Sequence, residues 1–310
     1  MESARETVLL TVAAIRGRRK DTEYLFNERQ QIFAPPPAAK KAEDISRLLQ
    51  EALRKKQPVK ATIDTRRALI HGAVAPSSRE IEEFHRLRIL LEKPDRTLRI
   101  NVDAIDPTTF NIVDHYLKFQ CFRLCRDIIP DYKTARKIFD FCAKQSCNLP
   151  GPYSISPCIP FQYVRDGCYA RAHKMRRIIT GRYRYCCEKV FSFANRGSDT
   201  LAVRADKWGG CCVTWWYHVA PLVRVRVGKL FVLAMVIDPG MFDKPVLLST
   251  WLAAQENTGC DPNANVSMYS IQPGSAYSPA NYAGTAFTTD PTYTSTNATL
   301  TAYSSLTTCP

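Results

Sequence analysis

Three side chains in the C-terminal half of the chain have the types needed to cleave an amide: Cys168, His218 and Asp238. A thiol can act as nucleophile, an imidazole can take its proton, and a carboxylate can orient the imidazole. Each residue also has a simpler interpretation, as a disulfide or buried cysteine, a core histidine and the start of an Asp-Pro turn. Taken together, the three favour cysteine-dependent acyl transfer if the fold brings them to one place.

The segment that carries Cys168 has the pattern of a helix. Cys168 and three small or apolar residues after it recur at spacings of four, three and four, which places them on one core-facing stripe. Asp166 is predicted to be the N-cap, and Gly167 allows a tight start. The thiol then lies in the first turn, where the helix dipole favours the thiolate. His173 lies about 140° further around the helix, so we do not expect it to be the base.

The other two side chains lie on two neighbouring segments that read as strands. Gly228 is midway between His218 and Asp238, so a hairpin that turns there makes them cross-strand neighbours, roughly 5 Å apart between Cβ atoms. Pro221 indicates a bulge that would shift this register by one residue. The three aromatic residues directly before His218 are expected to line a cleft or to pack in the core. The strand that carries His218 is predicted at residues 212–227, and the strand that carries Asp238 at residues 229–238.

The cysteines divide the chain of 310 residues into two parts. All twelve lie from Cys121 onward, which is typical of a disulfide-bearing, exported domain that follows a different kind of unit. Cys147 and Cys158 flank a loop that a disulfide is expected to close. The N-terminal part reads as a small α+β unit without a catalytic constellation. Its strands are predicted at 6–15, 22–27, 59–64 and 68–74, and its helices at 42–56 and 80–91.

The composition weighs against several other classes of protein. The net charge of +14 suggests nucleic-acid binding, but no zinc-finger spacing, basic helix repeat or aromatic-basic stacking motif supports it. The cysteine gaps do not fit paired zinc sites. No apolar run approaches the roughly 18 residues of a membrane span. The apolar stretch at residues 8–14 follows acidic residues and has no cleavage site after it, so it does not read as a signal peptide.

Three segments around the candidate residues resemble motifs of bacterial protein-glutaminases. They are Asp166-Gly-Cys-Tyr-Ala-Arg-Ala-His-Lys-Met175, Cys211-Cys-Val-Thr-Trp-Trp-Tyr-His-Val-Ala220 and Val236-Ile-Asp-Pro-Gly-Met-Phe242. The similarity extends from about residue 129 to residue 309. The chain departs from the family at Gln255 and Ala298, where the resemblance leads us to expect cysteines. The C-terminal disulfide pattern is therefore left open.

The resemblance implies an α+β fold with a papain/transglutaminase-like catalytic domain at residues 125–310, preceded by an inhibitory α+β pro-domain at residues 1–124. It implies a Cys168, His218 and Asp238 site that deamidates exposed glutamine side chains of proteins through a thioester, without a metal or other cofactor. The partners it implies are protein substrates, the chain's own pro-domain and an activating protease, but neither nucleic acid nor a membrane. The family is secreted, so we expect that a signal peptide has been removed from this sequence.

Three other interpretations stay open at this stage. A transglutaminase would pass the acyl group to a lysine amine. A papain-like cysteine protease would cleave the backbone instead of a side chain. A non-enzymatic, disulfide-rich binding module would need no free thiol at Cys168.

The N-terminal unit carries two further predictions. The junction before the catalytic region is basic at Lys118, Arg123 and Arg126, which indicates a protease-sensitive linker. An exposed loop or strand edge between Val59 and Val74 is predicted to enter the cleft, since an extended backbone resembles a bound substrate.

Overall fold

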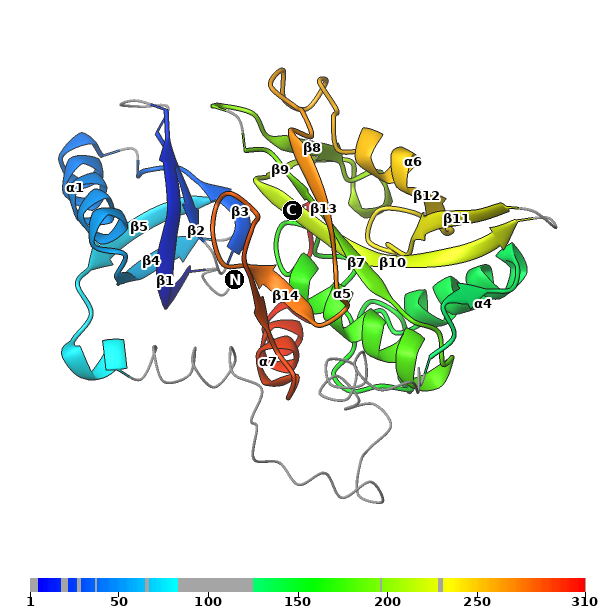
Figure 1. Cartoon of the computed structure of the whole chain (residues 1–310). Helices are drawn as coiled ribbons and strands as arrows, with labels where there is room; N and C mark the ends of the chain where they lie inside the picture. The colour runs from blue at the N-terminus through cyan, green and yellow to red at the C-terminus, as the bar shows by residue number, and fades with distance from the viewer. Residues whose placement is uncertain are drawn as a thin grey trace.

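The computed structural model describes residues 5–17, 22–26, 29–36, 38–64, 67–82, 125–195, 197–227 and 231–309. The described residues form an N-terminal part, up to residue 82, and a C-terminal part, from residue 125, which lie side by side (Figure 1). Both parts mix helices and strands, as the sequence predicts. Most of the predicted helix at 80–91 and the basic residues Lys118 and Arg123 lie outside the described residues.

An antiparallel sheet and one long helix form the N-terminal part. Its elements are β1 (Arg5–Arg16), β2 (Glu23–Phe26), β3 (Arg29–Phe33), α1 (Ala39–Lys55), β4 (Pro58–Asp64) and β5 (Leu69–Val74). Helix α1 buries Ile45, Leu49 and Ala52 together with apolar residues from all five strands. The other strands and α1 match the predicted segments, but β3 was not predicted.

A six-stranded sheet with helices on both faces forms the centre of the C-terminal part. The elements are β6 (Ile128–Ile129), α4 (Tyr132–Ala143), α5 (Cys168–Arg177), β7 (Glu188–Phe193), β10 (Tyr217–Val227), β11 (Phe231–Val236), β12 (Val246–Leu247), α6 (Leu248–Ala253) and β13 (Met268–Gln272). The order is β12-β11-β10-β7-β13, with β6 beside β10. Successive side chains of a strand point to opposite faces. Val219 and Val223 of β10 accordingly pack with α4 and α5, whereas Ala220 and Leu222 pack with Trp251 of α6.

The sheet of the N-terminal part continues into the C-terminal part. Strands β8 (Leu201–Arg204) and β9 (Cys212–Trp215) form an antiparallel ribbon, and β9 also pairs with β3 through Gln31 and Trp215. One seven-stranded sheet results, in the order β5-β4-β1-β2-β3-β9-β8 (Figure 1). The strand predicted at 212–227 is therefore divided at Trp216, because β9 and β10 belong to different sheets.

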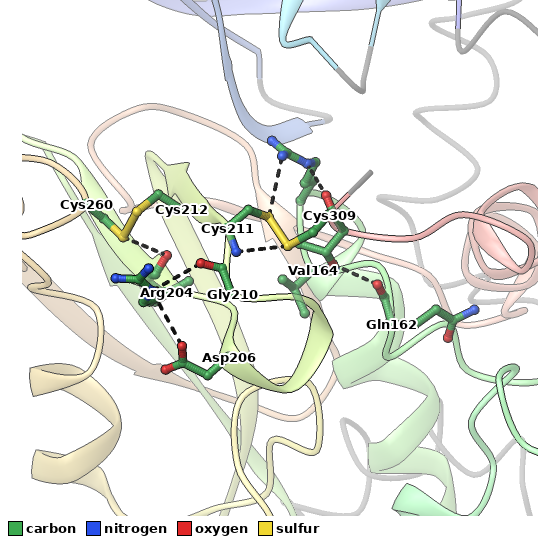
Figure 2. Close-up of a disulfide and its surroundings, with 12 residues drawn as sticks. Gln162, Val164, Arg204, Asp206, Gly210, Cys211, Cys212, Cys260 and Cys309 are labelled. Carbon is green, nitrogen blue, oxygen red and sulfur yellow. Dashed lines mark hydrogen bonds and ion pairs between the residues drawn. A yellow bond between two sulfur atoms is a disulfide. The ribbon is translucent and has the colours of Figure 1, made fainter.

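Disulfides hold the C-terminal part together. The neighbours Cys211 and Cys212 point away from each other and bind the C-terminal end of the chain and the loop at Cys260 to the start of β9 (Figure 2). The predicted closure of the loop between residues 147 and 158 is confirmed. The four disulfides of the described residues are Cys125–Cys186, Cys147–Cys158, Cys211–Cys309 and Cys212–Cys260.

The other described cysteines are outside any disulfide and are buried: Cys142, Cys168 and Cys187. Gln255, at a position where a cysteine was expected, is also buried. Its amide oxygen accepts a hydrogen bond from Ser192 at 2.6 Å, and its amide nitrogen donates to the carbonyl of Trp251. Polar contacts therefore hold this position where a disulfide was expected.

The last segments of the chain pack beside α5. They are β14 (Ala276–Pro279), β15 (Phe287–Thr289) and α7 (Thr294–Tyr303). Helix α7 contacts α5 and contributes Leu300 to the same core.

Candidate functional site

Gly167 starts the helix that carries Cys168. Its φ of 79° lies in the left-handed region, and an added Cβ would lie 2.9 Å from the ring of Tyr303, so another residue would be strained and crowded there. The predicted N-cap role of Asp166 is wrong, because Gly167 occupies that position. The carboxylate of Asp166 instead accepts hydrogen bonds from the N–H of Gly167 and the hydroxyl of Tyr303, each at 2.8 Å.

Cys168 is the first residue of α5 and is only 1% exposed. Burial raises the pKa of its thiol, while the guanidinium of Arg171 and the backbone N–H of Val219 lower it. Because burial is the larger effect, the pKa ends above its ordinary value in the intact chain, although the helix start was expected to favour the thiolate. The contact with Val219 places the sulfur beside β10, one residue after His218.

His218 and Asp238 form a buried pair in which ring Nε2 lies 2.9 Å from the carboxylate Oδ2. Burial lowers the pKa of His218 below its ordinary value, although Asp238 partly offsets this. Burial raises the pKa of Asp238, but the hydrogen bonds from His218 and from the indole of Trp251 outweigh it, and the pKa ends lowered. The directions describe a neutral imidazole beside a carboxylate. Among the described atoms, Nδ1 of His218 has no hydrogen-bond partner.

The hairpin that joins the two residues has a different register from the predicted one. Val227 pairs with Phe231, so the hairpin is centred at position 229 instead of 228, and every cross-strand partner shifts by two residues. Asp238 lies beyond the end of β11. Direct cross-strand opposition to His218 is therefore wrong. Cross-strand partners shift by an even number of residues, so the side chain of Asp238 stays on the face of the sheet that carries the side chain of His218. The carboxylate thus still reaches His218.

Two indoles enclose the ring of His218. The ring of Trp215 lies 4.5 Å away at an angle of 16°, and the ring of Trp251 lies 5.3 Å away at 24°. Trp215 comes from β9, and its indole N–H donates to the carbonyl of Val164. The sequence analysis missed Trp251, because only the fold brings α6 to the imidazole.

Arg171 is the second residue without a predicted role. It lies one turn after Cys168 and is buried. Its guanidinium donates to the carbonyls of Tyr163 and Asp166, each at 2.6 Å. It lowers the pKa values of Cys168, His218 and Asp238. Its place in the quoted helix motif was the available signal for a functional role.

His173 faces a different part of the core from the candidate site. Its Nε2 lies 3.0 Å from the carbonyl of Asp290, and its Nδ1 lies 2.7 Å from Nζ of Lys189. Both ring nitrogens of His173 therefore have other partners, in agreement with the expectation that His173 is not the partner of Cys168.

The N-terminal part adjoins the candidate site through its β1–β3 edge. Arg29 of β3 bonds to Asp166, and the indole of Trp216 donates to the carbonyl of Arg29 at 2.7 Å. Leu25 and Ile32 belong to the same apolar cluster as Cys168. The prediction that the edge between residues 59 and 74 enters the cleft is wrong, because β4 and β5 lie at the far end of the shared sheet (Figure 1).

Two kinds of site are absent from the described part of the chain. No group of three or more His, Cys, Asp or Glu side chains there is placed to hold a metal ion. No helix among these residues is long and apolar enough to cross a membrane.

Comparisons with known proteins found one family model and several solved structures that are similar to this chain. A family model described as Glutaminase matches residues 135–255. A crystal structure of pro-protein-glutaminase is 28% identical, with 99% of this chain and 95% of that chain covered and a TM-score of 0.71. The NMR structure of protein-glutaminase from Chryseobacterium proteolyticum is 38% identical, with 59% of this chain and 92% of that chain covered and a TM-score of 0.51. The comparison with curated proteins gave no match.

These matches define the class as glutaminases that carry a pro-region. Within that class, the chain belongs to the protein-glutaminase family. It is an enzyme of that family in its pro form, and its N-terminal part corresponds to the pro-region.

Proposed function

We propose that this protein hydrolyses the side-chain amide of exposed glutamine residues in other proteins, with Cys168 as nucleophile, His218 as base and Asp238 orienting the base. The observation that carries the proposal is the His218–Asp238 hydrogen bond on a strand whose next residue, Val219, contacts the sulfur of Cys168. A nucleophile, a base and an orienting carboxylate then form one connected group.

The reaction starts when Cys168 gives its proton to Nδ1 of His218 and the sulfur attacks the carboxamide carbon. The backbone N–H of Cys168 stabilises the oxyanion at the helix N-terminus. The C–N bond breaks to leave a thioester, and the departing nitrogen takes the proton from His218 and leaves as ammonia. Water then attacks the thioester with His218 as base, the C–S bond breaks, and the products are a glutamate side chain and the free thiol.

The partners of His218 support its role as the base. Asp238 holds Nε2–H, which fixes the tautomer that leaves Nδ1 ready to accept a proton. When the ring becomes charged, the indole faces of Trp215 and Trp251 stabilise the cation. Both effects favour the charged imidazolium that forms in the first step.

The domain roles follow from the contacts of β3. We assign residues 1–124 to an inhibitory pro-domain and residues 125–310 to the catalytic domain, because β3 pairs with β9 and the pro-region shares an apolar cluster with Cys168. A cysteine at a helix start, followed by a strand histidine and an aspartate, is the papain/transglutaminase-like arrangement.

Four disulfides are in keeping with secretion. A protease acting at the basic junction would release the pro-domain.

The test follows ammonia release from casein by the cleaved protein. Glutamine should become glutamate, and asparagine should remain, because its shorter side chain withdraws the amide from the sulfur. Cys168→Ser and His218→Ala should each lower the rate by about 10³-fold or more, and Asp238→Asn by less. The matched control Cys142→Ser replaces a free, buried cysteine of α4 and should keep the rate within about threefold.

The same assay separates the alternatives. Crosslinked products with an added amine would support a transglutaminase, and casein fragments would support a protease. A Cys168→Ala variant that keeps activity within about tenfold would contradict the assignment of the nucleophile.

A further inference from the structure

Arg29 of the pro-region binds a buried carboxylate beside the nucleophile helix. Its Nη1 lies 3.0 Å from Oδ2 of Asp166 and also donates to the hydroxyl of Tyr303, which in turn donates to Asp166. Asp166 is 0% exposed and Arg29 is 9% exposed. The guanidinium carbon also lies 5.9 Å from the centroid of the Tyr303 ring. Asp166 and Tyr303 therefore form an acceptor site for a guanidinium. Asp166 is two residues before Cys168 in the sequence.

The strand that carries Arg29 occupies the place of an added sheet strand. Gln31 pairs with Trp215 of β9, and the indole of Trp216 binds the carbonyl of Arg29. In the sheet order β9 lies between β3 and β8, so release of the pro-region leaves one edge of β9 to another extended segment. A substrate strand bound there as β3 is would bring one of its side chains to Asp166, as β3 brings Arg29.

We propose that Asp166 and Tyr303 are specificity residues that select substrates with a basic side chain flanking the target glutamine. The proposal rests on the glutaminase function proposed above. Release of the pro-region removes Arg29 from a carboxylate that is buried in the intact chain, and charge-assisted hydrogen bonds to a carboxylate are strong. Arginine is favoured over lysine, because its planar fork reaches the carboxylate and the hydroxyl together. An acidic side chain at the same position is repelled.

The pro-region has the sequence that this preference describes. Arg29 is followed directly by Gln30 and Gln31. A basic residue close before a glutamine is therefore present in the segment that the catalytic part already binds. The arginine is expected to act most strongly at one position, because only one side chain of an extended segment can reach Asp166.

Peptides test the preference on the cleaved protein after the pro-region has been removed. The solved protein-glutaminase of Chryseobacterium proteolyticum matches only 59% of this chain, so the smaller form exists on its own in that relative. Each peptide has one glutamine and carries arginine, lysine, norleucine or glutamate at one of the flanking positions. At one position, arginine should raise kcat/KM for ammonia release at least about tenfold over norleucine, with lysine between them and glutamate below. Equal values for arginine and norleucine at every position overturn this inference and leave the glutaminase function standing.

Two variants assign the preference to the site. The ratio of arginine to norleucine kcat/KM is measured within each variant, so a general loss of activity cancels. The ratio should fall to about 1 in Asp166→Asn and part of the way in Tyr303→Phe. Asp206→Asn, which replaces an exposed carboxylate, is the matched control and should keep the original ratio. An unchanged ratio in Asp166→Asn overturns the proposal.

If no peptide releases ammonia, that result counts against the proposed function. A binding measurement then still tests the specificity proposal. The cleaved Cys168→Ser protein is titrated with the arginine and norleucine peptides in a calorimeter. The arginine peptide should bind at least about tenfold more tightly. Equal affinities overturn the specificity role of Asp166.

Discussion

Some neighbours of Cys168 raise the pKa of its thiol and others lower it. The pro-region contributes to the burial that raises it. Burial raises its pKa, and Leu25 and Ile32 of the pro-region belong to the apolar cluster that buries it. The contributions that lower the pKa, from Arg171 and the N–H of Val219, come from the catalytic part itself. Removing the pro-region therefore weakens the burial that raises the pKa. It leaves the contributions of the catalytic part, which are the lowering ones of Arg171 and Val219 and the smaller raising ones of Asp166 and Asp238. The thiolate fraction at neutral pH should rise on activation.

Alkylation with iodoacetamide measures this change, because the thiolate is the reactive form. We expect Cys168 to react slowly in the intact protein at pH 7.5 or so and at least about tenfold faster after cleavage and release, in the range expected when a buried thiol gains access to water. Peptide mapping identifies the modified residue. Cys142 and Cys187, which are also buried, should stay unmodified in both forms. Equal rates at Cys168 would contradict a shielding role for the pro-region.

The sequence predicted the three proposed catalytic residues but not the residues that act through them. Cys168, His218 and Asp238 could be chosen because their chemical types form a recognised combination. Arg171 and Trp251 could not, because an arginine in a helix and an isolated tryptophan have many ordinary uses. Their roles depend on distances to His218 and Asp238 that only the packed structure defines.

At the scale of secondary structure, the sequence analysis missed the strand that matters most for the site. Strand β3 has only five residues, and it contains Arg29 and two glutamines. It lacks the apolar alternation of a half-buried strand, because Arg29 is neutralised by Asp166 of the other part. Long amphipathic elements such as α1 were predicted correctly, since their pattern is set by their own core. A strand at an interface, such as β3, cannot be recognised from its own sequence alone, because its pattern depends on the part that it packs against.

Helix α5 and strand β7 are joined by a buried pair of bases, His173 and Lys189. Burial is the main cause that lowers the pKa of both groups well below their ordinary values. Unfolding frees both to bind protons, so the unfolded state holds more protons than the folded state between the lowered and the ordinary pKa. Stability therefore rises with pH in those windows and is lost as the pH falls. The windows end near the ordinary values of 6.5 for His173 and 10.5 for Lys189.

Urea titrations should show a free energy of unfolding that falls from pH 9 to pH 5, by up to about 1.4 kcal/mol per pH unit for each group. Carboxylates do not titrate between pH 7 and 9 or so, but Lys174, whose pKa is lowered to about 8, and the thiols exposed on unfolding do. The change in slope between variants, and not the slope itself, therefore identifies Lys189. Lys189→Met should flatten the slope in that range, whereas Lys55→Met, at an exposed position on α1, should keep it. An unchanged slope in Lys189→Met would mean that Lys189 stays charged in the fold.

At the scale of the whole molecule, the disulfide between Cys125 and Cys186 determines where a cut in the chain would free the N-terminal part. Arg123 and Arg126 lie on either side of Cys125. Arg126 is bound to the catalytic part, with its N–H on the carbonyl of Arg184 and its guanidinium 4.2 Å from the Tyr185 ring centroid. A cut before Cys125 separates the two parts. A cut after Arg126 leaves the pro-region covalently attached through the disulfide.

Recognition sequences for a site-specific protease can test this dependence on position. One protein carries the sequence between Leu124 and Cys125, and the other between Arg126 and Asp127. After cleavage, non-reducing electrophoresis should separate the parts of the first protein only. Adding Cys125→Ser to the second protein should separate its parts as well. Separation of the second protein without that change would show that the disulfide does not hold the pro-region.

The two indoles around His218 also give the site an optical signal of its own. The chain has four tryptophans, and Trp215 and Trp251 lie flat against the imidazole. A charged imidazolium in contact with an indole quenches its emission, so fluorescence should fall as His218 gains a proton, and His218→Asn should abolish this step. In the intact protein, burial holds the pKa of His218 below 6.5, and the midpoint should lie in that acidic range. Release of the pro-region should move the midpoint upward, because water then reaches the imidazole and burial no longer lowers its pKa. Tryptophan fluorescence would therefore measure the solvent exposure of His218 in the absence of substrate.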